Sequence, residues 1–487
     1  MIEKIKELTK DTAIYGISTI VGRFLGFLLV PFYTNVINTN DYGIYSNIYA
    51  YLAFLNIVFI YGMDSAFMKY ASLNGVADKK KIFSTAYLFV AITSFGLALI
   101  LFLLKSPFIR VMEIPVQYSN LYHYLILILI FDTLALIPFA NLRLERKAGK
   151  FTVIKLANII LNLALNFILV LKFELGIEAI FIANLAASAF SFFALTPEIL
   201  KNIIVKIDKA ELKKYLKFGL PYLPASLAAT VVQVIDRPVV LALTNESTLG
   251  IYQANYKLGI FMMLFVSMFQ YAWQPFFLTN AKEKNAKELF SKILTIFMII
   301  AGLIWIVLTL FVEDFARFEF LSGKSIIGRE FLGGISIVPI ILLAYIFNGL
   351  YYNFQAGIYI EEKTKYYPYV TGAGAIANVV VNILLIPVLG IMGAALATLA
   401  SYIIMAAGLY YFSQKHYPIK YEYGKIFKIL GVIIITGIIY YYLYYTSGLN
   451  ILYKTFLLVG FIGSFFAMKV IEKNEFVRVI KMFLRIK

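Results

Sequence analysis

The sequence GIYSNIY at residues 43–49 recurs as GIYQANY at residues 250–256, 207 positions later. The surrounding segments, 31–49 and 238–256, align without a gap and share six identities in nineteen positions, among them Pro31 with Pro238. Each copy connects two long apolar runs. A repeat of this kind in a hydrophobic chain is typical of a transporter built from two related halves.

The composition indicates an all-α membrane protein. The chain has 487 residues, of which 61% are hydrophobic and only 15% charged, and its mean hydropathy is +0.82. A soluble protein of this length would carry about 25% charged residues. The apolar residues gather in helical runs of about 20, enough to cross a hydrocarbon core of about 30 Å. We therefore expect a polytopic membrane protein.

The apolar runs predict fourteen membrane spans. They lie at about residues 12–34, 44–68, 82–104, 120–142, 151–171, 176–197, 216–243, 250–280, 290–312, 331–359, 366–388, 391–413, 426–446 and 451–468.

The net charge of +17 is spread in a way that sets the orientation of these spans. Most Lys and Arg residues fall in short loops on alternate sides of the predicted helices, the positive-inside pattern. Both termini are therefore predicted to be cytoplasmic, and no nucleic-acid partner is expected. The chain has no cysteine and only two histidines, His123 and His416, so no metal site is expected.

The repeat also predicts the domain organisation. An N-lobe (1–197) and a C-lobe (218–413) are separated by the basic connection 198–217, followed by two further spans in 414–471. Six spans separate the two copies, so both lobes enter the membrane in the same direction. They would be related by a pseudo-twofold axis along the membrane normal. In 472–487 an apolar stripe (Phe476, Val479, Ile480 and Phe483) and a basic stripe (Arg478, Lys481 and Arg485) at helical spacing predict an amphipathic helix on the inner leaflet.

Charged residues within spans are candidates for a binding site, because each costs about 2.5–3.5 kcal/mol on insertion scales. Arg23, Arg237 and Lys257 predict a cationic cavity between the lobes. A guanidinium suits a phosphate, since its planar donors can engage two oxygens at once. The alternative is that these groups form ion pairs that hold helices together, such as Arg23 with Asp132.

Other polar residues within spans are weaker candidates. The carboxylates that could bind a coupling cation or proton are Asp64, Asp132 and Asp236. Candidate polar residues of the cavity are Asn158, Asn162, Asn378 and Asn382, which match in pairs between the halves. Hydrogen bonding between helices is the alternative role for these asparagines.

The sequence contains no recognisable enzyme site. It lacks a Gly-rich phosphate loop with a Lys, paired carboxylates in a loop, and a plausible Ser–His–Asp set. Even the longest outer connection, about 313–330, is too short to form a catalytic domain. The chain is therefore not expected to be an enzyme or to hydrolyse ATP itself.

Four segments resemble a known family: GRFLGFLLVPFYTNVINTNDYGIYSNIY (22–49), VIDRPVVLALTNESTLGIYQANYKLGIF (234–261), AWQPFF (272–277) and ANVVVNILLIPVLGIMGAALATLAS (377–401). They are similar to polysaccharide (Wzx-type) flippases of the multidrug/oligosaccharidyl-lipid/polysaccharide exporter superfamily, which have a MATE-like fold. The resemblance extends over nearly the whole chain, in the order and spacing of the motifs.

The resemblance implies a function. An undecaprenyl-diphosphate-linked oligosaccharide would be moved from the cytoplasmic to the outer leaflet of a bacterial inner membrane, for O-antigen, capsule or exopolysaccharide synthesis. The two lobes would alternate around the cavity, where Arg23, Arg237 and Lys257 would handle the diphosphate or acidic sugars. Spans 13 and 14 would flank a groove for the lipid tail. The resemblance further implies contacts with membrane lipids and polysaccharide polymerase or assembly proteins, no cofactor, and Na⁺ or H⁺ as the coupling ion.

Three alternatives stay open. A lipid II flippase would also have fourteen spans and a cationic cavity. A cation-coupled multidrug exporter of the same superfamily would favour twelve spans and an acidic cavity. A membrane glycan polymerase or glycosyltransferase would need a large loop with catalytic residues, which this chain lacks.

Overall fold

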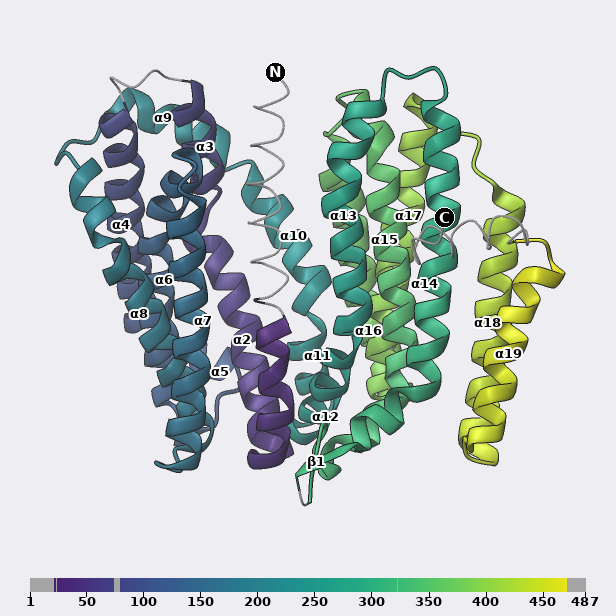
Figure 1. Cartoon of the computed structure of the whole chain (residues 1–487). Helices are drawn as coiled ribbons and strands as arrows, with labels where there is room; N and C mark the ends of the chain where they lie inside the picture. The colour runs from purple at the N-terminus through teal and green to yellow at the C-terminus, as the bar shows by residue number, and fades with distance from the viewer. Residues whose placement is uncertain (1–21, 23, 74–78, 322, 471–487) are drawn as a thin grey trace.

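The computed structural model describes residues 22, 24–73, 79–321 and 323–470, and Figure 1 shows their arrangement. Two groups of long helices converge on a small antiparallel hairpin of β1 (Glu319–Leu321) and β2 (Lys324–Ser325). We call the group from the helix Phe24–Val36 to α8 the N-half, and the group from α10 to α17 the C-half. The end of the molecule at β1 is called the hairpin end.

The N-half begins with the helix Phe24–Val36. Its further helices are α2 (Thr39–Ile60), α3 (Met63–Leu73), α4 (Lys79–Leu103), α5 (Lys105–Val111), α6 (Asn120–Leu144), α7 (Ala148–Leu171) and α8 (Gly176–Asn202). The helix α9 (Lys209–Gly219) then leads to the C-half.

The C-half contains α10 (Tyr222–Val234), α11 (Asp236–Leu243), α12 (Glu246–Tyr256), the 3₁₀ turn η3 (Lys257–Gly259), α13 (Ile260–Asn280), α14 (Ala286–Arg317), the 3₁₀ segment η4 (Arg329–Ile337), α15 (Val338–Ile360), α16 (Tyr366–Leu389) and α17 (Ile391–His416). Two more helices, α18 (Tyr423–Thr446) and α19 (Ile451–Ala467), pack against α14 beside the C-half. The buried Lys454 of α19 forms an ion pair with Asp314 of α14, where these helices meet the C-half.

The all-α, multi-pass membrane fold is confirmed. Among the described residues, eleven helices are long and apolar enough to cross a membrane, or twelve if the bent pair Lys209–Val234 and Asp236–Leu243 is one span. Two shorter apolar helices, Phe24–Val36 and Ile451–Ala467, lie where the first and fourteenth spans are predicted. Fourteen spans and the exact lobe boundaries stay predictions, and segment 472–487 lies outside the described residues.

Several spans are interrupted, each for a local reason. Tyr61 and Gly62 adopt left-handed φ values of 34° and 74°, which end α2 and begin α3. A Cβ at Gly62 would lie 2.5 Å from the Gly219 carbonyl oxygen, so glycine is required where α3 meets α9. Between α10 and α11 the axis bends by 52°. Pro238 accounts for this bend, because its ring excludes a regular hydrogen bond to the carbonyl four residues earlier.

The two copies of the repeat fold in the same way and meet each other. Asn38 caps the N-terminus of α2 and Asn245 caps that of α12, each with its side-chain oxygen. The helices then cross so closely that a Cβ at Gly43 would lie 1.9 Å from the Glu246 carbonyl oxygen. A Cβ at Gly250 would likewise lie 2.0 Å from the carbonyl oxygen of Thr39. The repeated glycines therefore form the contact between the halves at the hairpin end.

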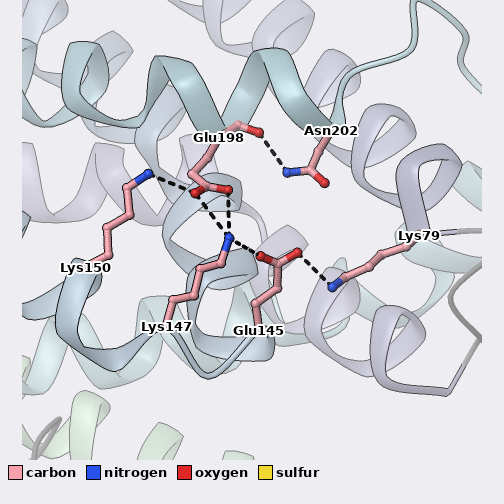
Figure 2. A network of polar contacts seen from close by, with 6 residues as sticks. All are labelled: Lys79, Glu145, Lys147, Lys150, Glu198 and Asn202. Carbon is pink, nitrogen blue, oxygen red and sulfur yellow. Dashed lines mark hydrogen bonds and ion pairs between the residues drawn. The ribbon is translucent and has the colours of Figure 1, made fainter.

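The opposite end of the N-half carries a network of ion pairs, shown in Figure 2. The Lys147 ammonium lies between two carboxylates, 2.7 Å from Glu145 Oε2 and 3.3 Å from Glu198 Oε1. Lys79 and Lys150 complete the network at 2.8 Å from Glu145 and Glu198 respectively. Burial raises the pKa of Glu145, but hydrogen bonds from Lys147 and Lys79 outweigh it and bring the pKa to about 2. The network joins α4, the α6–α7 turn and α8 at the end of the N-half away from the hairpin.

Candidate functional site

A cavity of about 560 Å³ lies between the two halves. Its walls come from Phe24–Val36, α2, α7 and α8 on one side, and from α10 to α13, α15 and α17 on the other. This volume falls within the usual range for ligand sites, about 300–1,000 Å³. The position between two related halves is where transporters of this architecture place their substrate.

The polar lining consists of cations, tyrosines and amides. Its members are Arg237, Lys257, Ser267, Tyr33, Tyr45, Tyr49, Tyr256, Tyr345, Tyr352, Tyr402, Asn162, Asn184, Asn348, Gln233, Gln253 and Gln270. Among the described residues that line the cavity there is no Asp or Glu. The cavity is therefore positively charged.

Arg237 reaches the cavity from the bend between α10 and α11. Its Nε atom is buried and has no hydrogen-bond partner among the described residues. The neighbouring Asp236 is engaged elsewhere: its carboxylate accepts a 2.6 Å hydrogen bond from the Tyr252 hydroxyl and one of 3.1 Å from the Arg237 backbone N–H. The bend thus separates the guanidinium, which lines the cavity, from a carboxylate that is held by Tyr252.

Lys257 also lies at an interruption of a span, in the 3₁₀ turn η3 between α12 and α13. Its Nζ atom is 5.8 Å from the centre of the Tyr42 ring and 5.6 Å from that of Tyr45, both on α2 of the N-half. No carboxylate of the described residues lies within ion-pair distance of Lys257 or Arg237. Both cations are therefore available to an anion.

Unpaired polar atoms are found beside these cations. Gln253 Nε2, which lines the cavity, and the Tyr42 hydroxyl are buried without a hydrogen-bond partner among the described residues. A buried polar group without a partner costs about 1–3 kcal/mol, so such atoms favour a ligand that can bond to them. Two cations and a free amide N–H can serve a multiply charged anion such as a diphosphate.

The structure brings only part of the predicted site together. Arg237, Lys257 and Asn162 line the cavity. Asp236 lies directly behind Arg237 and is buried. Arg23 lies outside the described residues.

The other two predicted carboxylates do not line this cavity. Asp132 interacts with the Ser188 hydroxyl and the Lys155 ammonium within the N-half. Asp64 lies in α3, beyond the interruption at Tyr61 and Gly62. Their role as coupling groups stays a prediction.

All four predicted asparagines form hydrogen bonds between or along helices, and Asn162 Oδ1 accepts one of 3.1 Å from Asn166 Nδ2. Asn158 donates to the carbonyl of Ala187 at 2.6 Å and to Ser191 Oγ at 2.9 Å. In the C-half, Asn378 donates to the Val232 carbonyl at 3.4 Å, and Asn382 to Asn378 Oδ1 at 2.6 Å. These contacts favour the alternative role in helix packing.

The tyrosines and most of the amides of the lining were not predicted as site residues. Tyr45, Tyr49 and Tyr256 belong to the identities of the repeat, so the repeat itself was the available signal. No group of three or more His, Cys, Asp or Glu residues that could hold a metal ion is found in the described part of the chain.

Comparison with known proteins places the chain in a family. The model of a family described as polysaccharide biosynthesis protein matches residues 34–322. A protein of Haemophilus influenzae named as an uncharacterized membrane protein is 22% identical over 287 residues, which cover 58% of this chain and 67% of that protein.

Two solved structures share the fold. The lipid II flippase MurJ in an inward closed conformation has a TM-score of 0.72 at 18% identity, with 94% of this chain and all of that chain covered. A multidrug resistance MATE family transporter of the MOP superfamily, in an inward-facing conformation, has a TM-score of 0.65 at 13% identity, with coverages of 81% and 94%. The TM-scores show a common fold, and at identities this low they show the fold alone. The predicted MATE-like architecture is confirmed.

Proposed function

Since the chain belongs to the polysaccharide biosynthesis protein family, we propose that it is a flippase for an undecaprenyl-diphosphate-linked oligosaccharide. It would carry this substrate from the cytoplasmic to the outer leaflet of a bacterial inner membrane, with both termini in the cytoplasm. The observation that carries the proposal is that Arg237 and Lys257 line a cavity between the two halves without an ion-pair partner, and that no carboxylate is found among the described residues of the lining. A diphosphate is the part of such a substrate that these groups would bind.

The rest of the lining suits a sugar. Tyrosine rings offer flat apolar surfaces to the C–H faces of pyranoses, while amides such as Asn184, Asn348 and Gln270 can donate to and accept from hydroxyl groups. The cavity thus combines a charged region for the diphosphate with a neutral polar region for the glycan.

A second cavity, which is apolar, is the proposed binding site of the lipid tail. It has a volume of about 370 Å³ and lies between α14, α15, α17 and α18. Its lining residues are Leu294, Leu350, Phe354, Tyr410, Tyr421, Tyr423, Ile426 and Phe427. Such a surface suits a polyprenyl chain better than a charged headgroup.

The described lining, with two cations and no carboxylate, favours an anionic substrate over a cationic drug. The coupling ion is proposed to be Na⁺ or H⁺, and Asp236, which interacts with Arg237, is the proposed coupling carboxylate. Movement of this carboxylate's partner Tyr252 would be needed to admit an ion.

The function is tested by depletion of the chain in cells that make a surface polysaccharide. Polyprenyl-linked glycan should accumulate with its sugar facing the cytoplasm. An unchanged leaflet distribution together with normal surface polysaccharide would refute the flippase. Parallel measurement of lipid II distinguishes the two substrates, since only one of them should accumulate.

The site is tested with substitutions in the same assay. Arg237→Ala and Lys257→Ala should each reduce transport by at least about tenfold, because a charge-assisted hydrogen bond contributes about 1.5–3 kcal/mol. Arg237→Lys should retain part of the activity. Lys292→Ala is the matched control, since this exposed lysine pairs with the exposed Glu288 and is not part of the cavity lining.

A further inference from the structure

We infer that an anion in the cavity loosens the hairpin end by drawing Lys257 away from Tyr42 and Tyr45. This inference rests on the proposed function, because it requires an anionic group of the substrate in the cavity. It adds a link between occupancy of the cavity and separation of the two halves.

The hairpin end is closed by backbone contacts that leave no room between the halves. The glycine crossing of α2 and α12 is reinforced by a hydrogen bond of 2.8 Å between Thr39 Oγ1 and Ser247 Oγ. These atoms belong to different halves. Closure therefore depends on direct contact of the two helices.

The hairpin and the loop that follows it form a second set of contacts between the two halves. Asn35 at the end of the helix Phe24–Val36 donates to the Ser325 carbonyl at 2.6 Å, and the Gly328 N–H donates to Thr34 Oγ1 at 3.1 Å. A Cβ at Gly328 would lie 1.8 Å from the Thr34 carbonyl oxygen. The loop of the C-half thus lies against the backbone of the N-half.

Lys257 connects this closure to the cavity. It directly follows the repeat sequence GIYQANY in α12, and its ammonium faces two rings on α2, the other helix of the crossing. The cation–π attraction therefore pulls the two crossing helices together. The same ammonium lines the cavity, where a phosphate would compete for it.

The competition favours the phosphate. A charge-assisted hydrogen bond to a phosphate is stronger than a cation–π contact at these distances. Arg237 lies close enough to Lys257 for the two cations to repel each other, and an anion between them removes that repulsion. Lys257 also lies in a 3₁₀ turn, a feature that often marks a hinge within a span.

Closure of the hairpin end is measurable because the natural chain has no cysteine. The double variant Thr39→Cys, Ser247→Cys places two thiols where oxygens are 2.8 Å apart. In nanodiscs under mild oxidation, this pair should form a disulfide. The single variants Thr39→Cys and Ser247→Cys should form none within the chain.

The probe is undecaprenyl diphosphate, added before oxidation. It should slow disulfide formation by about fivefold, which corresponds to the loss of about 1 kcal/mol of cation–π attraction. In the background of Lys257→Met, the rate without lipid should already be low and the lipid should have little further effect. Lys257→Arg should restore the response.

The outcomes separate the two proposals. The inference would be overturned if undecaprenyl diphosphate slowed disulfide formation equally with and without Lys257→Met. It would also be overturned if the lipid bound and the rate of disulfide formation did not change. Absence of lipid binding would refute the proposed function and the inference with it. Slow but complete disulfide formation in the Lys257→Met background shows that this variant is folded. Tyr42→Leu, which removes a ring outside the cavity lining, should weaken the response in the same way.

Discussion

The glycine crossing predicts that one methyl group will prevent closure of the hairpin end. In Gly43→Ala, the new Cβ would lie 1.9 Å from the Glu246 carbonyl oxygen and 3.1 Å from the Gly250 backbone nitrogen. Ordinary contacts begin near 3.4 Å, so α2 and α12 must separate by more than an ångström. Overpacking of this kind costs about 1–3 kcal/mol. The closed state should lose about 5–150-fold in population relative to open states.

In the proposed orientation, with both termini in the cytoplasm, the hairpin end faces the outside. The assay for this variant is therefore the labelling rate of Ser247→Cys by a membrane-impermeant maleimide added to intact cells. Gly43→Ala should raise that rate. Gly96→Ala is the matched control, because a Cβ at Gly96 in α4 would meet no described atom within 4 Å. Equal labelling in the two alanine variants, with both proteins present at normal levels in the membrane, would refute the tight crossing of α2 and α12.

Three further predictions concern other parts of the chain. The pKa of Glu145 is about 2 in the folded protein against 4.5 for a free carboxyl, so its stabilisation is complete above about pH 4.5 and is lost as the pH falls towards 2. The melting temperature of Glu145→Gln should therefore lie below that of the wild type at pH 7, and the gap should narrow below pH 4.5. Lys454→Glu would place a buried carboxylate beside Asp314 and should lower the melting temperature by several degrees, whereas Lys454→Met should change it little because Asp314 is half-exposed. Tyr252→Phe leaves the buried Asp236 without one hydrogen bond and should lower the free energy of unfolding by about 1–3 kcal/mol, measured by thermal denaturation in detergent.

The sequence predicts the helices well because length and hydropathy decide which segments can cross a bilayer. The span expected at 366–388 is α16 (Tyr366–Leu389), and the one expected at 176–197 begins at the predicted Gly176. The interruptions at Tyr61 and Lys257 were not predicted, because each depends on packing against a helix distant in the sequence.

The candidate site could be predicted only in its charged part. Arg237 and Lys257 stand out because a charge within a span needs a reason to be there, and both line the cavity. Gln253, Asn348 and Tyr352 also line it, but neutral polar and aromatic residues are common in membrane helices and carry no such signal. Their role depends on where the two halves meet, which the sequence of one half does not specify.

The crossing of α2 and α12 has a consequence for the origin of the chain. Each copy of the repeat presents the same glycine face to the other, which is the isologous geometry of a C2 homodimer. A half-length ancestor would need no new surface to pair with itself along this axis. Within one chain the two copies can differ: Arg237 and Lys257 align with Val30 and Ala50 of the first copy. A single chain can thus carry a cation in one copy of the repeat and not in the other. Two identical subunits would carry it in both.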